Sequence, residues 1–176
     1  MKILVIQQKM IGDVLTSSIL FEALRTQYKE ATLHYLINEN TMDVVENNPF
    51  IDEFVVASPK DLKNFFHLMR FAKKIRDHRY DVIIDVYSKL SSHIITAFSK
   101  AKIKISYHKK QSLWIYDHNI KRAHHDSVEN SLELLNRLKL IQPLGIEKTN
   151  AIPKIYLNEK EIIYICKTIK NFYKKN

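Results

Sequence analysis

A single carboxylate beside a glycine has the clearest chemical potential in this sequence. Residues 2–7 (KILVIQ) form a largely apolar run, and Gly12 and Asp13 follow it after a short polar segment. In an open sheet of parallel strands, ligands bind beyond the carboxyl ends of the strands, so the loop after a first strand is a place to look for chemistry. A carboxylate there has the properties of a general base that takes a proton from a hydroxyl group.

Two interpretations of Asp13 remain open on the local sequence alone. An aspartate at the start of a helix caps the backbone by accepting N–H hydrogen bonds, which is worth about 1 kcal/mol. The alternative is the general base at the ligand edge of the sheet. Spacing by itself favours the helix cap.

Glycine is scarce, and this excludes two kinds of nucleotide site. The chain has two glycines, Gly12 and Gly145. A dinucleotide-binding G-x-G-x-x-G turn and a phosphate-binding P-loop both need several glycines close together, so neither is present. We therefore expect no cofactor. So few chain breakers also disfavour a β-sandwich with many tight turns and favour long helices.

The apolar pattern predicts strands that alternate with helices. Strands are expected at residues 2–7, 32–37, 54–56, 81–86 and 103–106, and helices at 14–28, 40–47, 61–78, 90–98, 127–140 and 159–173. Residues 107–125 have no clean period, and residues 155–157 fit a short strand or an extended link. Alternation of this kind predicts an α/β fold, with a Rossmann-like parallel sheet and helices on both faces.

Composition and cysteine usage indicate an ordinary domain of a reducing compartment. The 176 residues include one cysteine, Cys166, which lies among isoleucines and is expected to be buried and unreactive. No apolar run reaches the roughly 20 residues of a membrane helix, and the run after Met1 is too short for a signal peptide. A cytoplasmic protein is expected.

The net charge of +9 leaves two interpretations open. Lysines scattered over helices and tail form a solvated surface in most proteins. The alternative is a basic face that attracts an anionic partner such as lipid phosphate, a phosphorylated sugar or nucleic acid.

Several segments, in order, resemble one enzyme family. The opening KILVIQQKMIGDVLTSSILFEALRTQYKEATLHYLI looks like the start of the ADP-heptose:lipopolysaccharide heptosyltransferases, glycosyltransferase family nine. Residues 46–53 (ENNPFIDE) resemble the family's link before its third strand, and residues 80–85 (YDVIID) resemble its fourth strand. Residues 125–140 match a further block more loosely. The ordered set spans residues 2 to about 140.

The resemblance implies a two-domain GT-B glycosyltransferase, in which the N-terminal half binds the sugar acceptor and the C-terminal half binds the nucleotide-sugar donor. The resemblance implies that Asp13 is the general base. It therefore favours the general base over the helix cap, which spacing alone had favoured. Gly12 would allow the close loop geometry, and Lys9 would lie near an anionic acceptor. Residues 1–157 are expected to form the acceptor-side domain, with 158–176 as a terminal helix leading toward a donor domain that the sequence lacks. Such a chain would be inactive alone unless a partner supplied that half.

Further candidates for acceptor binding are a basic group and one acidic residue. Lys60 and Lys63, with Arg70, Lys73 and Lys74, are expected on the helix after the third strand, where the family resemblance implies a basic surface that faces phosphorylated lipid-linked sugar. A solvated helix face is the other interpretation. Asp85 ends the fourth predicted strand and would orient a substrate or cap the loop.

One loop departs from the family pattern. Residues 86–89 (VYSK) stand where the family usually has a Gln-Gly loop, so the details of acceptor recognition are expected to differ.

Metal ligands and stacking aromatics are the remaining possibilities. His124, His125 and Asp126 are adjacent, but no third ligand has convincing spacing, so no metal site is expected. Trp114 and Tyr116 fit either stacking on a sugar or packing in the core.

Two functions follow. The first is a glycosyltransferase that moves a sugar from a nucleotide-sugar to an anionic lipid-linked saccharide, at the inner face of the membrane and peripherally associated with it. The second is a non-catalytic basic module that binds nucleic acid or an anionic membrane. No nucleic-acid recognition motif accompanies the charge, so nucleic acid is not expected as a partner.

Overall fold

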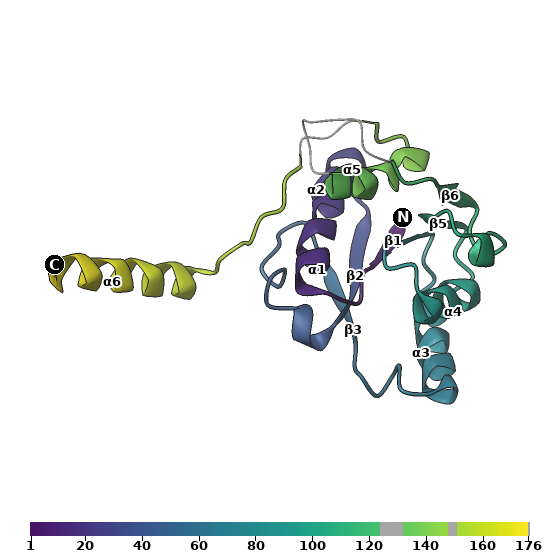
Figure 1. The fold of residues 1–176 in the computed structure, drawn as a ribbon, viewed down its shortest axis with the longest axis horizontal. Coiled ribbons are helices and arrows are strands. Elements are labelled where there is room, and N and C mark those ends of the chain that lie inside the picture. Colours follow the sequence, from purple (N-terminus) through teal and green to yellow (C-terminus); the bar gives the residue numbers. More distant parts are fainter. Residues whose placement is uncertain (124–131, 148–150, 176) are drawn as a thin grey trace.

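In this computed structural model, the described residues are 1–123, 132–147 and 151–175, with side chains described as far as residue 167. These residues form a parallel sheet in the order β3-β2-β1-β4-β5-β6 (Figure 1). The strands are β1 Lys2–Ile6, β2 Thr32–Asn38, β3 Glu53–Ala57, β4 Val82–Asp85, β5 Ile103–Tyr107 and β6 His118–Ile120. The predicted Rossmann-like parallel sheet is confirmed, and β6 adds a short strand within a segment whose sequence has no clean period.

Helices cover both faces of the sheet. These helices are α1 Ile11–Ser17, α2 Ile19–Gln27, α3 Phe65–Asp77, α4 Leu90–Phe98 and α5 Leu132–Lys139, and the chain ends in a further helix, α6 Glu159–Lys175. Residues of α1 and α2 share one apolar core with Ile3 and Val5 of β1. Residues of α3 and α4 share a second core with Leu4 and Ile6 of the same strand. Because successive strand side chains point to opposite faces, one apolar strand supplies both cores.

The predicted helix 14–28 is two helices that meet at Ser18. The break follows from three consecutive hydroxyl residues, two of which bond back to the preceding turn. Thr16 Oγ1 donates to the carbonyl of Gly12 at 2.9 Å, and Ser18 Oγ donates to that of Leu15 at 2.8 Å. Such local bonds compete with regular helix formation. The first helix also begins earlier than expected, at Ile11, and this places Asp13 inside its first turn.

Two other helices are shorter than the pattern predicts. The predicted helix 40–47 is wrong, since only a 3-10 turn at Glu39–Thr41 forms and turns follow it. The helix predicted from 61 begins at Phe65, because Ser58 and Asp61 close a turn of their own and Asn64 caps α3 by accepting from the His67 amide at 3.0 Å.

The last helix, α6, lies apart from the sheet (Figure 1). Its connection to the body includes an edge-on ring contact between Phe50 and Tyr156 and an ion pair between Lys154 and Glu22. Ile162 and Ile165 are exposed, and so is Cys166, so the expectation of a buried thiol is wrong. Residues 155–157 are extended and form no strand. Among the described helices, none has both the length and the apolar composition that crossing a bilayer requires.

Candidate active site

The strand order has a switch point between β1 and β4, because the loops that follow these adjacent strands lead to helices on opposite faces of the sheet. These strands are neighbours in the sheet, but α1 packs on one face and α4 on the other. The two loops therefore diverge at the carboxyl edge, which is where open α/β sheets bind their ligands. Residues 7–10 and 86–89 form the two sides of this point.

Asp13 lies on the β1 side of this switch point and is half exposed. It is the third residue of α1, so Met10 and not Asp13 is the N-cap residue, but the Asp13 carboxylate does accept the Met10 N–H group as part of a capping box. Its Oδ1 pairs with Arg137 Nη2 at 2.8 Å, and 45% of its side chain is exposed. Its Oδ2 faces the Met10 amide at a long 3.5 Å. One carboxylate oxygen is thus anchored, and the other is weakly engaged by the described residues.

Arg137 is the residue that holds Asp13 in place, and the sequence interpretation missed it. The side chain comes from α5 and is only 3% exposed. Its Nη1 also pairs with Glu133 Oε1 at 2.8 Å, one turn earlier on the helix, and its Nε lies 3.4 Å from Thr16 Oγ1. Two carboxylates therefore compensate one buried guanidinium, which fixes the side-chain geometry. The sequence did contain a sign of this role, because the charged Arg137 lies between Leu134 and Leu138 on the apolar side of the helix.

Gly12 lies in the first turn of α1 and is exposed. A Cβ atom built there would meet nothing within 4 Å among the described residues, and its φ is not positive. The loop itself therefore does not require glycine at this position. The missing side chain leaves room beside Asp13.

Lys9 lines a cavity of about 440 Å³ at the ends of β1, β2 and β3. Asn38, Glu39, Asn40, Pro59 and Leu62 are the other lining residues. Lys60 and Lys63 lie in the exposed loop beside this cavity and do not line it. The expectation that these two lysines lie on the helix after the third strand is wrong, because α3 starts only at Phe65.

Three buried polar atoms at this edge have no hydrogen-bond partner among the described residues. They are Gln8 Nε2, Asn38 Oδ1 and Ser88 Oγ. The three residues end or follow β1, β2 and β4, which are adjacent in the sheet. Buried polar atoms are nearly always satisfied in native proteins, so unpaired ones gathered at one edge favour a polar ligand there.

Asp85 ends β4 and is completely buried, unlike Asp13. Its Oδ1 accepts from the Ser88 amide at 2.8 Å, and its Oδ2 accepts from the hydroxyl of Tyr116. Burial raises the pKa of Asp85 to about 6. Complete burial leaves Asp85 no surface for a substrate, so any contribution to binding would act through the 86–89 loop that it holds.

His93 of α4 joins this buried group and was also missed from the sequence. Its Nδ1 lies 2.7 Å from the Tyr116 hydroxyl and 3.7 Å from Asp85 Oδ2. Burial, with Lys109 nearby, lowers the pKa of His93. This contact could not be predicted from the sequence, because only the fold brings residues 85, 93 and 116 together.

An apolar cavity of about 490 Å³ opens next to His93, between α4 and the segment that follows β5. Trp114 lines it and is 79% exposed, whereas Tyr116 is buried. Of the two interpretations offered for these aromatics, core packing therefore fits Tyr116, and Trp114 remains at the surface.

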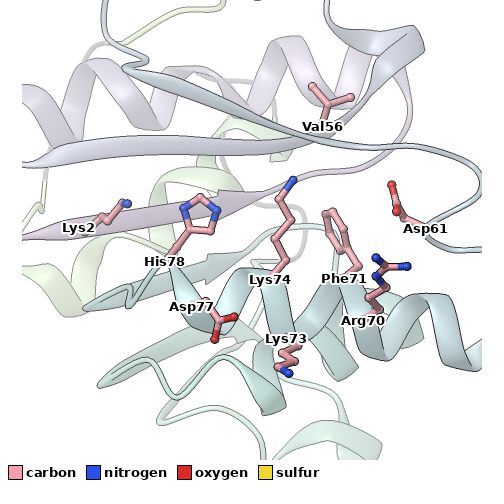
Figure 2. A pocket seen from close by; sticks show the side chains of 9 residues that line it. All are labelled: Lys2, Val56, Asp61, Arg70, Phe71, Lys73, Lys74, Asp77 and His78. Atoms are coloured by element: carbon pink, nitrogen blue, oxygen red, sulfur yellow. The ribbon is translucent and has the colours of Figure 1, made fainter.

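The remaining lysines and arginine of the basic group face a different cavity. A hollow of about 670 Å³ runs along α3 and is lined by Arg70, Lys73 and Lys74, together with Lys2 and His78 (Figure 2). It lies on the α3 face of the sheet, opposite the face on which α1 packs. These charges are therefore not brought together with Asp13. His124, His125 and Asp126 lie outside the described residues.

Comparison with known proteins gives this arrangement a family. Residues 68–174 match the family model of Glycosyltransferase family 9 (heptosyltransferase). The chain belongs to glycosyltransferase family 9. The matched segment includes Arg137 and Asp85 but begins after Asp13, so the family assignment does not test the role of that aspartate.

Individual heptosyltransferases resemble the chain over more than half of its length. Lipopolysaccharide heptosyltransferase 3 of Escherichia coli is 28% identical over 147 residues, which is 77% of this chain and 41% of that protein. Lipopolysaccharide heptosyltransferase 1 of Campylobacter coli is 24% identical over 96 residues, 54% of this chain and 28% of that protein. The chain thus spans less than half the length of these relatives.

Solved family 9 structures share the fold. The glycosyl transferase of Veillonella parvula DSM 2008 superimposes with a TM-score of 0.73 at 21% identity, covering 99% of this chain and 49% of that one. ADP-heptose lps heptosyltransferase II of E. coli gives a TM-score of 0.69 at 16% identity, covering 96% and 50%. Family membership leaves the alternative of a non-catalytic nucleic-acid module without support.

Proposed function

We propose that this chain is the acceptor-side part of a heptosyltransferase-type glycosyltransferase that acts in lipopolysaccharide biosynthesis. The observation that carries the proposal is the half-exposed Asp13 carboxylate, held by buried Arg137 at the carboxyl edge of the sheet in a family 9 chain. The relatives named as lipopolysaccharide heptosyltransferases support the substrate class.

In the proposed reaction, Asp13 acts as the general base. The hydroxyl oxygen of the acceptor attacks the anomeric carbon of the donor sugar, and Asp13 takes the hydroxyl proton. The bond between the anomeric carbon and the phosphate oxygen breaks, so the nucleoside diphosphate leaves with that electron pair. Arg137 holds Oδ1 of the carboxylate and so fixes its orientation. The weakly engaged Oδ2 is then positioned to accept the proton.

The acceptor is proposed to bind across the ends of β1, β2 and β4. Lys9 at the cavity wall would face an anionic group of the lipid-linked saccharide. The unpaired polar atoms of Gln8, Asn38 and Ser88 are buried, and rotation of these side chains toward the acceptor would let them form hydrogen bonds with sugar hydroxyls. A saccharide is rich in both donors and acceptors, so it suits amide and hydroxyl side chains together.

The donor is proposed to bind outside residues 1–176. On this proposal, residues 1–157 form the acceptor-side domain and residues 158–176 lead toward a donor-binding part. The length of the relatives, about twice that of the chain, supports this division. The chain alone would then bind acceptor but transfer no sugar.

A position at the cytoplasmic face of the membrane, with peripheral attachment, is part of the proposal. Large apolar side chains are exposed in and beside the loops of the carboxyl edge, namely Met10, Phe65, Phe66, Leu90 and Trp114. Lysines accompany them, including Lys9, Lys60 and Lys63. Exposed apolar side chains with basic neighbours are typical of surfaces that attach to anionic membranes.

The test joins this chain to the donor-side half of E. coli lipopolysaccharide heptosyltransferase 3 and measures sugar transfer to a lipopolysaccharide acceptor. Asp13→Asn should lower kcat at least 100-fold, because it removes the base while keeping the side-chain size. Asp77→Asn, at the exposed end of α3 by the opposite edge of the sheet, serves as the matched control. Equal activities of the two variants would exclude Asp13 as the base.

A further inference from the structure

A second cluster of polar side chains lies at the opposite, amino edge of the sheet. His34 is the third residue of β2, Glu53 opens β3, and His78 caps the end of α3. His34 and Glu53 are paired neighbours in the parallel ladder, so their side chains share one face. That face is the one covered by α3, since Leu36 and Val55, two positions further along each strand, belong to the core beneath it.

The ligand atoms of these three residues lie close together. One nitrogen of each imidazole and one carboxylate oxygen all fall within 4.8 Å of one another. The His34 Nε2 and Glu53 Oε2 atoms are 3.2 Å apart. Tetrahedral zinc, with bonds of 2.0–2.2 Å, holds its ligand atoms about 3.3 Å apart. The first pair already has that spacing, and a small rotation of the partly exposed His78 and Glu53 side chains brings in the third atom.

Neighbouring aromatic contacts fix the two imidazole rings. The Tyr80 hydroxyl lies 2.9 Å from His34 Nδ1. When Nδ1 carries the proton and donates to that oxygen, Nε2 presents its lone pair toward Glu53. The Tyr80 ring also stacks on His78, with centroids 5.6 Å apart and planes at 12°. A hydrogen bond to the second ring nitrogen is the usual support of a metal-binding histidine.

We propose that His34, Glu53 and His78 bind one zinc-type divalent transition-metal ion. Two imidazoles and a carboxylate are a known three-ligand set for zinc, with the fourth position left to water. His78 lines the cavity along α3, between Lys2 and Lys74, so that position is open to solvent (Figure 2).

The charges around the cluster are compatible with a bound cation. Burial is the main cause that lowers the pKa of His34 and of His78, and this direction favours the neutral imidazole that a metal ion needs. Lys2 opposes a cation, with its ammonium 5.4 Å from the centre of the Tyr80 ring. Glu53 supplies the compensating carboxylate, and Asp52 and Asp77 are the other acidic groups that act on the two imidazoles.

The position of the cluster indicates a structural role. It joins the edge strand β3 and its neighbour β2 to the end of α3, whereas Asp13 lies beyond the carboxyl end of β1 on the other face. A metal held there would stabilise the fold without touching the proposed reaction. Binding should therefore appear as thermal stabilisation, because a ligand that binds only the native state shifts unfolding.

The test titrates Co²⁺ and then Zn²⁺ into metal-free chain 1–176. We expect one equivalent of Co²⁺ to give the intense visible absorption of tetrahedral coordination, Zn²⁺ to abolish it, and Zn²⁺ to raise Tm. His78→Gln and Glu53→Gln, at partly exposed positions that tolerate change, should each weaken binding at least tenfold. Tyr80→Phe should weaken it about tenfold through the lost hydrogen bond to His34.

The control variant is His124→Gln with His125→Gln, which removes the only adjacent histidines in the sequence. It should bind metal as the unmodified chain does. Absence of a tetrahedral Co²⁺ spectrum in the unmodified chain would overturn the proposal. So would loss of binding in the control, or full binding in the His78→Gln variant.

Discussion

Asp13 and Asp85 stand at the carboxyl ends of adjacent strands, yet their surroundings are opposite. Asp13 is half exposed and paired with a charged guanidinium, whereas Asp85 is completely buried and bonded to an amide and a hydroxyl. Burial raises the pKa of Asp85 to about 6. Position at the ligand edge therefore does not by itself define a catalytic carboxylate. A half-exposed carboxylate in a fixed orientation distinguishes the residue proposed to react from the buried one that holds its loop.

The largest expected effect separates the two aspartates in the joined enzyme. Asp13→Asn should lower kcat by about 10²–10⁴, the usual range for loss of a general base. Asp85→Asn should retain most of the kcat per folded molecule, because the amide keeps an oxygen for the Ser88 N–H group. Steady-state kinetics of both variants, corrected for the folded fraction, checks the contrast. If Asp85→Asn lowered kcat as much as Asp13→Asn, the proposed difference between the two aspartates would be wrong.

Removing the partner of Asp13 should affect stability more than removing Asp13. Arg137→Met leaves Asp13 and Glu133 without their shared cation and should cost about 2 kcal/mol, a value reduced because both carboxylates are half exposed. Asp13→Asn should cost about 1 kcal/mol or less, since Glu133 still pairs with Arg137. Urea unfolding at pH 7 measures both. A larger loss of unfolding free energy in Asp13→Asn than in Arg137→Met would contradict this prediction.

The raised pKa of Asp85 predicts a pH-dependent stability. Its value is about 6 in the folded chain against 3.8 for the ordinary group, so folding is favoured while the carboxyl is protonated. That contribution is complete below about pH 4 and is lost as the pH rises through 6, by up to about 3 kcal/mol.

Unfolding free energies measured between pH 4 and pH 7 test this prediction. The decline should be present in the unmodified chain and in Asp13→Asn, and absent in Asp85→Asn. An unchanged decline in Asp85→Asn would assign it to another group.

The smallest effect concerns the lysines at the cavity by the ends of β1, β2 and β3. Lys9→Ala should raise the acceptor KM at low salt, because Lys9 lines the cavity. The increase should be only about fivefold, because solvent screens the charge of Lys9. Lys60→Ala, in the loop beside it, should change KM less. Both differences should shrink at 0.5 M salt. An equal effect of the two substitutions would indicate general attraction in place of a defined contact.

The fold was predictable because the two central strands carry apolar runs, residues 3–6 (ILVI) and 82–84 (VII). These runs bury side chains on both faces, as is typical of a parallel sheet under two helical layers. The break at Ser18 and the late start of α3 were not predicted, since both depend on side-chain bonds to the backbone that apolar periodicity does not register.

The site was predictable only in part. Gly12 and Asp13 drew attention through their place after the first strand, and the resemblance to family 9 gave the aspartate a role. Arg137 lies 124 residues away from Asp13, so no local pattern could pair them. His34, Glu53 and His78 meet for the same reason, through the register of β2 with β3 and the end of α3.

The exposed apolar face of α6 has a practical consequence in the test tube. Ile162, Ile163 and Ile165 stand in solvent on a helix that lies apart from the sheet, and Cys166 is exposed beside them (Figure 1). Concentrated samples should self-associate through this helix, and without reductant two chains should become linked through their thiols. A chain ending at residue 157 and handled at the same concentration should remain monodisperse and be the better subject for crystallisation.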